Sequence, residues 1–299
     1  MNIEISKEES NVISLVRILA MASIVLCHIL QAYGNPLAWR FNVGVQIFLV
    51  LSGYLYGHKE IHNWVTWLWQ RFKKLYIPCF LYCAVTLTVL HYFAGQNVGW
   101  LDYITISAVD GISHLWFMKA IFLCYAITPL LSYLRRWGGH WLYLILIAIG
   151  IVEFGYFHIA QEYFSWVWLY SMGYFFPLLK DSYKRYVWIA FGAIAIIVTI
   201  YLQFPHDRNM ADLWHYVCGL AFCIIPIQLI RFSRYSTIIK KLDSYSFHVY
   251  ITHHIYLVGP LSLVPLFSGA WIAVPTILCL MTISAVVLKF ISDAAVKLF

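Results

Sequence analysis

The stretch Arg17-Ile-Leu-Ala-Met-Ala-Ser-Ile-Val-Leu-Cys27-His28 holds a charged and a titratable side chain inside the first long apolar run of the chain. Eleven helical residues return to within about 20° of the same face and rise about 16 Å along the axis. Ionisable residues within a membrane span are costly and commonly face a protein interior or a watery cavity. The pair therefore indicates either a functional site, or an arginine that reaches the headgroups and a histidine satisfied by a neighbouring helix.

The composition is that of a polytopic membrane protein. The 299 residues are 62% hydrophobic and 11% charged, and the mean hydropathy is +0.76. A soluble domain is typically about 45–50% apolar and about 25% charged. Apolar runs long enough to cross a bilayer recur from end to end. We therefore predict an all-α bundle of transmembrane helices that forms a single domain over residues 1–299, with no appended soluble domain.

About ten membrane spans are predicted. They cover residues 13–33, 41–57, 75–93, 113–134, 141–157, 164–180, 186–203, 210–230, 245–261 and 270–291. Lysine and arginine concentrate in alternate loops, whereas the opposite loops contain only Arg40 and Arg208. The positive-inside rule then predicts that both termini are cytoplasmic. Because this asymmetry accounts for the net charge of +7, the charge gives no reason to expect nucleic-acid binding.

Cations gather at the entrance to the predicted third span, as Arg71, Lys73 and Lys74 in the stretch from Arg71 to Pro78. Such a cluster can bind lipid headgroups or a soluble anion such as a nucleotide phosphate. On the opposite side, His114 and Lys119 lie within two helical turns of the start of the fourth span. The long side chain of Lys119 can extend to the membrane interface, so its position alone is weak evidence for a function.

A second basic centre is predicted in the ninth span. Spacings of three and four put Tyr250, His253 and His254 on or near one helix face. A zinc site could be built from His28, His253 and His254, but the carboxylate spacing of a hydrolytic zinc helix is missing, so no metal is expected. Glu153 is the remaining acid within a predicted span, and it can orient a histidine or pair with an arginine.

Five motifs, in this order, resemble the acyltransferase 3 family of membrane proteins. They are Arg17 with His28, the stretch Phe41 to Leu55, the basic stretch Arg71 to Pro78, the start of the fourth span at His114-Leu115-Trp116-Phe117, and Ser246 through Tyr250 to His253. They extend over nearly the whole chain. The version found here is most similar to bacterial polysaccharide O-acetyltransferases.

This resemblance implies an activity. An acyl group, usually acetyl from acetyl-CoA, would be transferred to a hydroxyl of an exported or lipid-linked glycan by an integral protein of the bacterial cytoplasmic membrane. The resemblance also implies that Arg17 and His28 are essential. Two residues depart from the family pattern: Gln46 replaces an acid, and Asp243 replaces a glycine. The first departure puts in doubt any mechanism that needs a carboxylate at residue 46.

The spacing on the first helix agrees with this chemistry. Arg17 lies near the cytoplasmic boundary, and with the three cations of the third span it can bind the phosphates of acyl-CoA. His28 lies about 16 Å deeper, where a neutral imidazole can take the proton of an acceptor hydroxyl. An acyl-histidine relay is an alternative to direct transfer, and succinyl-CoA is an alternative donor.

Five further residues are candidates to bind the acceptor or to orient His28: Glu153, His114, Lys119, Tyr250 and His253. Expected partners are acyl-CoA, the glycan acceptor and membrane lipids, and a homo-oligomer is possible. The alternative function is a secondary transporter with a proton or anion path through Arg17, His28, Lys119, Glu153 and His253. Against a transporter, the sequence shows no internal inverted repeat.

A third alternative is a membrane protein whose polar residues only hold its helices together. Ser52 and Gly53 are expected to allow close helix packing rather than nucleophilic chemistry, because no Ser-His-Asp order accompanies them. The ordered family motifs argue against a purely structural protein.

Overall fold

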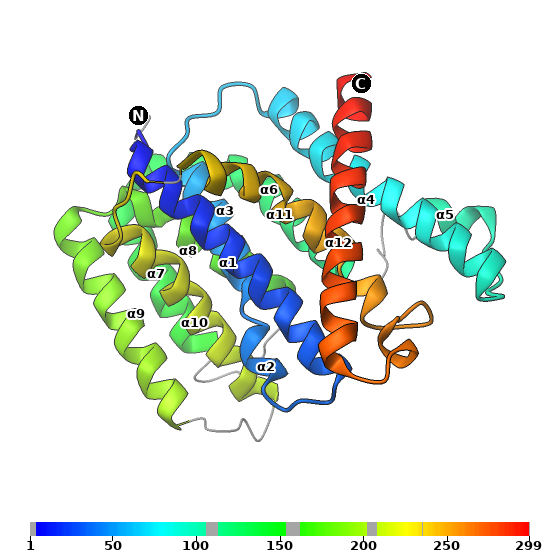
Figure 1. Cartoon of the computed structure of the whole chain (residues 1–299). Coiled ribbons are helices and arrows are strands. Elements are labelled where there is room, and N and C mark those ends of the chain that lie inside the picture. The colour runs from blue at the N-terminus through cyan, green and yellow to red at the C-terminus, as the bar shows by residue number, and fades with distance from the viewer. Residues whose placement is uncertain (1–3, 106–112, 154–161, 202–207, 235, 299) are drawn as a thin grey trace. The chain divides into compact units, whose positions relative to one another are not determined.

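A computed structural model of the chain describes residues 4–105, 113–153, 162–201, 208–234 and 236–298. Every regular element within these ranges is helical, which confirms the all-α prediction. Six helices of the described chain are long and apolar enough to cross a membrane (Figure 1). They are Lys7–Ala32, Trp64–Phe93, His114–Leu134, Asp181–Tyr201, Ala211–Leu229 and Ala270–Leu298. The higher count of about ten spans and the cytoplasmic termini stay predictions.

The labels of Figure 1 refer to helices with the following bounds: α1 Lys7–Ala32, α2 Ala38–Phe41, α3 Gly44–Gly57, α4 Trp64–Phe93, α5 Trp100–Thr105, α6 Phe117–Leu134, α7 Gly139–Val152, α8 Glu162–Phe175, α9 Asp181–Tyr201, α10 Arg208–Leu229, α11 Ser236–Thr252 and α12 Ala270–Leu298. Short 3-10 helices include η2 Ser113–Trp116 and η6 His254–Tyr256.

The chain divides into two compact units. Unit 1 comprises Met1–Ala20, Asn42–His62 and Leu123–Lys240. Unit 2 comprises Met21–Phe41, Asn63–Phe122 and Lys241–Phe299. The helix α1 runs without interruption from Lys7 to Ala32 and so contributes residues to both (Figure 1).

The helix α4 begins at Trp64, well before the predicted span at residue 75. Asn63 caps it, because the side-chain oxygen of Asn63 accepts a hydrogen bond of 3.0 Å from the backbone N–H of Thr66; such caps satisfy one of the orphan donors of the first turn. Arg71, Lys73 and Lys74 therefore lie within the helix rather than in a loop that leads to it.

The predicted ninth span, residues 245–261, extends beyond the end of its helix. The helix α11 runs from Ser236 to Thr252, and η6 follows it directly. Gly259 has a φ of +91°, which ends any continuation as a helix, since this backbone region favours glycine. Pro260 adds to the effect, because the residue before a proline is disfavoured in the helical region. His253 and His254 thus stand at a helix end and not in a helix interior.

Unit 1 is built on the close packing of α3 against α8. A β-carbon added at Gly53 would overlap with the carbonyl oxygen of Tyr170, and one added at Gly173 would overlap with the carbonyl oxygen of Val50. Each glycine therefore lets the backbone of the facing helix approach to contact, as small residues do between membrane helices. The packing role predicted for Gly53 is confirmed.

Gln46 lies at the start of α3, where α10 packs against it. A β-carbon added at Gly219 of α10 would lie 2.5 Å from the β-carbon of Gln46. In the amide orientation that satisfies both of its atoms, the side-chain nitrogen of Gln46 donates to the carbonyl oxygens of Asn42 (2.9 Å) and Val43 (3.2 Å). A carboxylate has no proton to donate at neutral pH, so glutamine suits this position where an acid would not.

A polar network joins α1 to the end of α3 in unit 1. The Tyr54 hydroxyl donates to Glu9 Oε1 over 2.5 Å. His58 Nδ1 donates to the Tyr54 carbonyl oxygen over 2.8 Å, and His58 Nε2 lies 3.8 Å from Glu9 Oε1. His58 follows α3 in the connection to α4, and burial lowers the pKa of its imidazole, because a buried site disfavours the charged form.

In unit 2, α1 meets α11 and α12 in a small apolar core. The core consists of Val25, Val249, Met281 and Ala285. A second cluster, which contains Leu257, Ala273 and Ile277, packs the turn after α11 against the start of α12. These two clusters fix the position of residues 253 and 254 relative to the end of α1, which carries His28.

Candidate active site

Four histidine rings meet inside unit 2. His28 comes from α1, His114 from η2, and His253 and His254 from the end of α11 and the start of η6. The ring centroid of His28 lies 5.0 Å from that of His253 and 4.7 Å from that of His254. The His114 ring lies 4.7 Å from each of the same two rings. We call these four residues the imidazole cluster.

The imidazole of His28 is oriented by Gln31. His28 Nδ1 and Gln31 Oε1 are 2.7 Å apart. Because the amide oxygen only accepts, Nδ1 carries the hydrogen, and Nε2 of the neutral ring keeps its lone pair. A lone pair on Nε2 is what a proton acceptor or a nucleophile needs. Gln31 was missed by the sequence reasoning, although its i+3 spacing from His28 places the two on one helix face.

Tyr250 holds two other rings of the imidazole cluster. Its carbonyl oxygen accepts from His114 Nε2 over 2.9 Å and from His253 Nδ1 over 2.7 Å. Its hydroxyl donates to the carbonyl oxygen of His114 over 2.6 Å. The carbonyl of Ile251 also accepts from His114 Nε2, over 3.1 Å. Main-chain oxygens therefore fix which nitrogen of each ring carries the hydrogen.

The opposite nitrogens of these two rings are buried lone pairs. Within the described residues, neither His114 Nδ1 nor His253 Nε2 has a hydrogen-bond partner. The two side chains are 6% and 0% exposed. Since buried polar atoms are nearly always hydrogen-bonded, these two atoms offer acceptor positions for the hydroxyl of a ligand or of a water. No group of three or more His, Cys, Asp or Glu within the described ranges has the arrangement of a metal site.

The basic residues of α4 lie over aromatic rings of the same helix. The Arg71 guanidinium carbon is 6.0 Å from the centroid of Trp67, and Lys73 Nζ is 5.9 Å from that of Trp69. Both are cation–π pairs at a spacing of four residues. Lys74 is exposed. These cations belong to unit 2.

Three further predicted residues stand elsewhere. Arg17 is half-buried in the part of α1 that belongs to unit 1. Glu153 directly follows α7 as its C-cap, also in unit 1, and its backbone N–H donates to the carbonyls of Ile149 and Gly150. Lys119 is half-buried in the first turn of α6, in unit 2. The imidazole cluster itself is built from unit 2 alone.

A comparison with protein families matches the chain to a family model. The family model Acyl_transf_3, described as an acyltransferase domain, matches residues 11–291. This range contains Arg17, the imidazole cluster and the three cations of α4. No curated protein and no solved structure matches the chain.

Proposed function

The chain belongs to the acyltransferase 3 family, and we propose that it transfers an acyl group, in the first place acetyl, from cytoplasmic acyl-CoA to a hydroxyl of a glycan or lipid-linked sugar at the cell envelope. The observation that carries the proposal is the imidazole cluster, in which His28 keeps a lone pair on Nε2 beside two further buried acceptor nitrogens. The bacterial cytoplasmic membrane is the proposed location, since its inner face supplies acyl-CoA.

In direct transfer, His28 is the general base. Nε2 takes the proton of the acceptor hydroxyl while the hydroxyl oxygen attacks the thioester carbonyl carbon. A carbon–oxygen bond forms, the carbon–sulfur bond breaks, and the CoA thiolate leaves with the electron pair. The thiolate then receives the proton from His28, which returns to the neutral form. The products are an ester and the CoA thiol.

A relay through His28 uses the same atom. Nε2 would attack the thioester carbonyl, form a carbon–nitrogen bond and release the CoA thiolate. The acceptor oxygen would then attack the acyl carbon, so that a carbon–oxygen bond forms, the carbon–nitrogen bond breaks and Nε2 regains its electron pair. The hydroxyl proton would pass to the CoA thiolate, directly or through a neighbouring ring. His253 is a candidate for this neighbouring ring, because its centroid lies 5.0 Å from that of His28.

The other imidazoles suit a hydroxyl-bearing substrate. His114 Nδ1 and His253 Nε2 are uncharged acceptors with no partner within the described part of the chain. A sugar presents several O–H donors, which match such acceptors one by one. Tyr250 is then a positioning residue, because its carbonyl and hydroxyl hold the His114 segment and the His253 ring in place.

For the donor, we propose that the phosphates bind to Arg17, Arg71, Lys73 and Lys74. Arginine offers a planar fork to phosphate oxygens, and lysine offers a point charge. The family match supports an acyltransferase and does not favour the alternative, a secondary transporter.

Binding of acetyl-CoA to the purified full-length protein in nanodiscs tests the proposal. Calorimetry compares the wild type with Arg17→Ala, and with Arg40→Ala as a control for the loss of one arginine at a position predicted on the opposite membrane face. We expect binding by the wild type and the control, and weaker binding by Arg17→Ala. If the folded wild type binds neither acetyl-CoA nor succinyl-CoA, the proposed function is wrong.

A further inference from the structure

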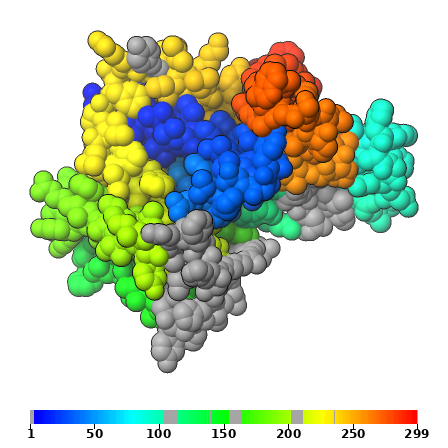
Figure 2. Space-filling view, turned by 60° about the horizontal axis from the view of Figure 1, so that its bottom comes forward, coloured from blue at the N-terminus to red at the C-terminus, as the bar shows by residue number. Residues whose placement is uncertain are grey.

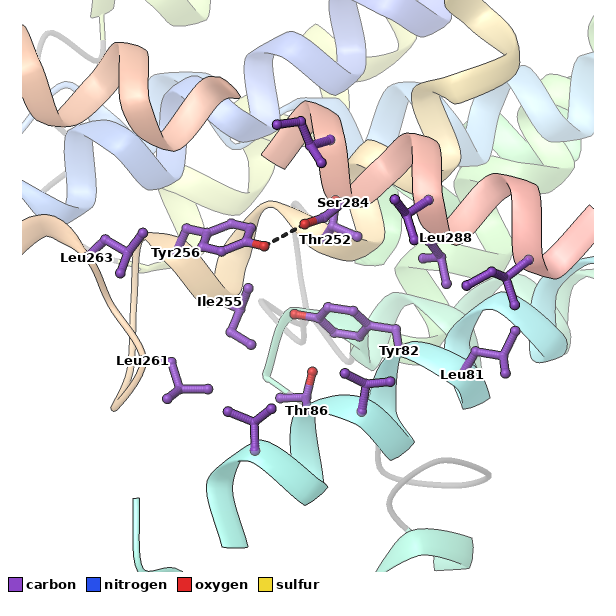
Figure 3. A pocket seen from close by; sticks show the side chains of 15 residues that line it. Leu81, Tyr82, Thr86, Thr252, Ile255, Tyr256, Leu261, Leu263, Ser284 and Leu288 are labelled. Atoms are coloured by element: carbon purple, nitrogen blue, oxygen red, sulfur yellow. Dashed lines mark hydrogen bonds between the residues drawn. The ribbon is translucent and has the colours of Figure 1, made fainter. Parts of the chain in front are cut away.

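An apolar groove of about 550 Å³ lies within unit 2. Fifteen side chains line it, from α4, from α12 and from the turn between residues 252 and 263 (Figure 3). None of these fifteen is charged. The volume falls in the range of about 300–1,000 Å³ that is typical of ligand pockets. The lining suits neither the phosphate end of CoA nor a bare sugar, because it offers no charged group and only a few hydroxyls in place of their hydration.

The outer walls of the groove are formed by α4 and α12 and are exposed on the surface of unit 2. Val85 of α4 is 64% exposed, and Ile283 and Val287 of α12 are 54% and 50% exposed. Both helices are long and apolar enough to cross a bilayer. In the space-filling view, the orange residues of the turn before α12 and of its start lie on the surface (Figure 2). A ligand can therefore enter this groove sideways from the hydrocarbon region of the membrane.

The floor of the groove is buried and carries hydroxyl groups. Tyr82, Thr86 and Thr252 are 8%, 3% and 2% exposed. At one side, the hydroxyls of Tyr256 and Ser284 form a hydrogen bond of 2.5 Å, and the Tyr82 hydroxyl points into the same space (Figure 3). Hydroxyls are not needed to hold a plain lipid tail. They fit a ligand that is apolar along most of its length and polar near one end.

The groove and the imidazole cluster share a wall. Thr252, Ile255 and Tyr256 line the groove, and the two residues between them, His253 and His254, belong to the imidazole cluster. On the other side, the Tyr82 ring in the floor meets the His114 ring edge-on, with centroids 6.4 Å apart. A ligand in the groove therefore lies against residues that adjoin His114, His253 and His254.

We propose that this groove binds the hydrocarbon chain of a lipid-linked acceptor and so presents the attached sugar to the imidazole cluster from within the membrane. The inference rests on the proposed function and narrows its acceptor to one chemical class. A chain held by apolar walls leaves the sugar as the only part of the ligand that needs polar partners, and the imidazole lone pairs supply them. A water-soluble sugar would gain nothing from the groove.

Photolabelling of the full-length protein in nanodiscs tests this inference. The probe is farnesyl glucoside with a diazirine in its farnesyl chain, and labelled peptides are identified by mass spectrometry. Val287→Trp places a large ring in the groove. Val286→Trp is the matched control, because Val286 is the adjacent residue of α12, is 46% exposed, and does not line the groove.

We expect the wild type and Val286→Trp to be labelled within residues 81–89, 252–263 and 283–291. Val287→Trp should be labelled about tenfold less, because its indole ring fills space that the farnesyl chain would occupy; tenfold corresponds to about 1.4 kcal/mol. Equal labelling of the two variants, or labelling outside these segments, overturns the inference. So does competition by dioleoylphosphatidylcholine that equals competition by unlabelled farnesyl glucoside, because the groove would then be an ordinary lipid site.

Acetyl-CoA binding by the same preparations separates this inference from the proposed function. If all three proteins bind acetyl-CoA while the labelling does not distinguish the variants, only the groove inference fails. If the folded wild type fails to bind acyl-CoA, the proposed function fails, and selective labelling would still establish a site for an isoprenoid chain.

Discussion

The two units differ in what fills the space between their helices. In unit 1, the glycines of α3 and α8 bring two helix backbones into direct contact, and no volume is left between them. In unit 2, the space where α1, η2 and η6 meet is filled by four imidazole rings. The glycine contacts hold α3 and α8 tightly together. The imidazole cluster places four titratable rings at a point where apolar side chains would pack the helices equally well.

One polar network of unit 1 and the imidazole cluster of unit 2 also differ in how completely their atoms are hydrogen-bonded. The Glu9, Tyr54 and His58 network of unit 1 pairs its side chains with one another. In the imidazole cluster, two buried ring nitrogens lack a partner within the described residues. Satisfied networks stabilise a fold, whereas an unsatisfied buried group needs another explanation, such as a ligand. This difference between the two networks supports the proposal that the chemistry takes place in unit 2.

The largest effect is expected for His28→Gln. Glutamine retains the size of the side chain but can neither take a proton nor carry an acyl group, so transfer of radiolabelled acetyl should fall about 10²–10⁴-fold. His140→Gln in unit 1 is the control and should keep wild-type activity. Nearly normal transfer by a folded His28→Gln protein would rule out both the general base and the relay.

Gly53→Val tests the scaffold of unit 1. The added side chain meets the carbonyl of Tyr170, which belongs to the backbone and cannot rotate away. We expect a loss of about 3 kcal/mol in the free energy of unfolding, at the upper end of overpacking effects, measured as a lower thermal midpoint in detergent. Gly99→Ala is the control, because its β-carbon would make only an ordinary contact of 3.5 Å with Asp102. A midpoint equal to that of the control would refute the tight packing.

Arg17→Lys tests the proposed role of Arg17 in donor binding. The charge stays, but the planar fork that binds phosphate oxygens in pairs is lost. The affinity for acetyl-CoA in calorimetry should fall about tenfold, which corresponds to about 1.4 kcal/mol. Unchanged affinity would remove Arg17 from the donor site and leave the cations of α4.

Tyr250→Phe removes one hydrogen bond from the frame of the imidazole cluster. The lost bond joins the Tyr250 hydroxyl to the His114 carbonyl, and a net value of about 1 kcal/mol for such a bond corresponds to about fivefold in rate. We expect a fall in kcat with an unchanged affinity for acetyl-CoA. Tyr201→Phe, at an exposed position of α9, should have no effect. A tyrosine role in proton transfer would instead give a much larger loss.

The smallest effect is expected for the pH dependence of stability, through His58 of unit 1. Because burial lowers the pKa of His58, the folded protein binds its proton less readily than the unfolded chain does. The stability contribution is complete above about pH 6.5, the ordinary pKa of histidine, and is lost as the pH falls towards the folded pKa. The drop in thermal midpoint between pH 7.5 and 5.5 should be smaller in His58→Gln. An equal drop in both proteins would show that other groups cause it.

The sequence predicts this fold well where apolar runs are long. The fourth predicted span, 113–134, coincides with η2 and α6, and the tenth begins at residue 270 as α12 does. The end of α11 was missed because hydropathy continues past Thr252, while the backbone turns at Gly259. Local signals were present there, in the pair Gly259-Pro260, but the apolar count outweighed them.

The sequence identified most residues of the candidate site but not the way in which they contact one another. Spacing along one helix relates Arg17 to His28, and Tyr250 to His253. It says nothing about the meeting of His114 with His253, which depends on how η2 packs against α11. The hydrogen bond from His28 to Gln31 and the two buried lone pairs follow from ring orientation, which sequence patterns do not report. The donor role of Arg17 and the acceptor roles of Glu153 and Lys119 stay predictions.

Because the oxygen that holds the His114 and His253 rings is the backbone carbonyl of residue 250, it persists whichever side chain stands there. Which nitrogen of each ring carries the hydrogen is thus set by the course of the main chain and not by the side chain at position 250. Variation at position 250 during evolution or in directed selection can alter rate and acceptor fit without changing which ring nitrogens carry hydrogen. Only a substitution that redirects the main chain at the end of α11, such as proline, would change that pattern.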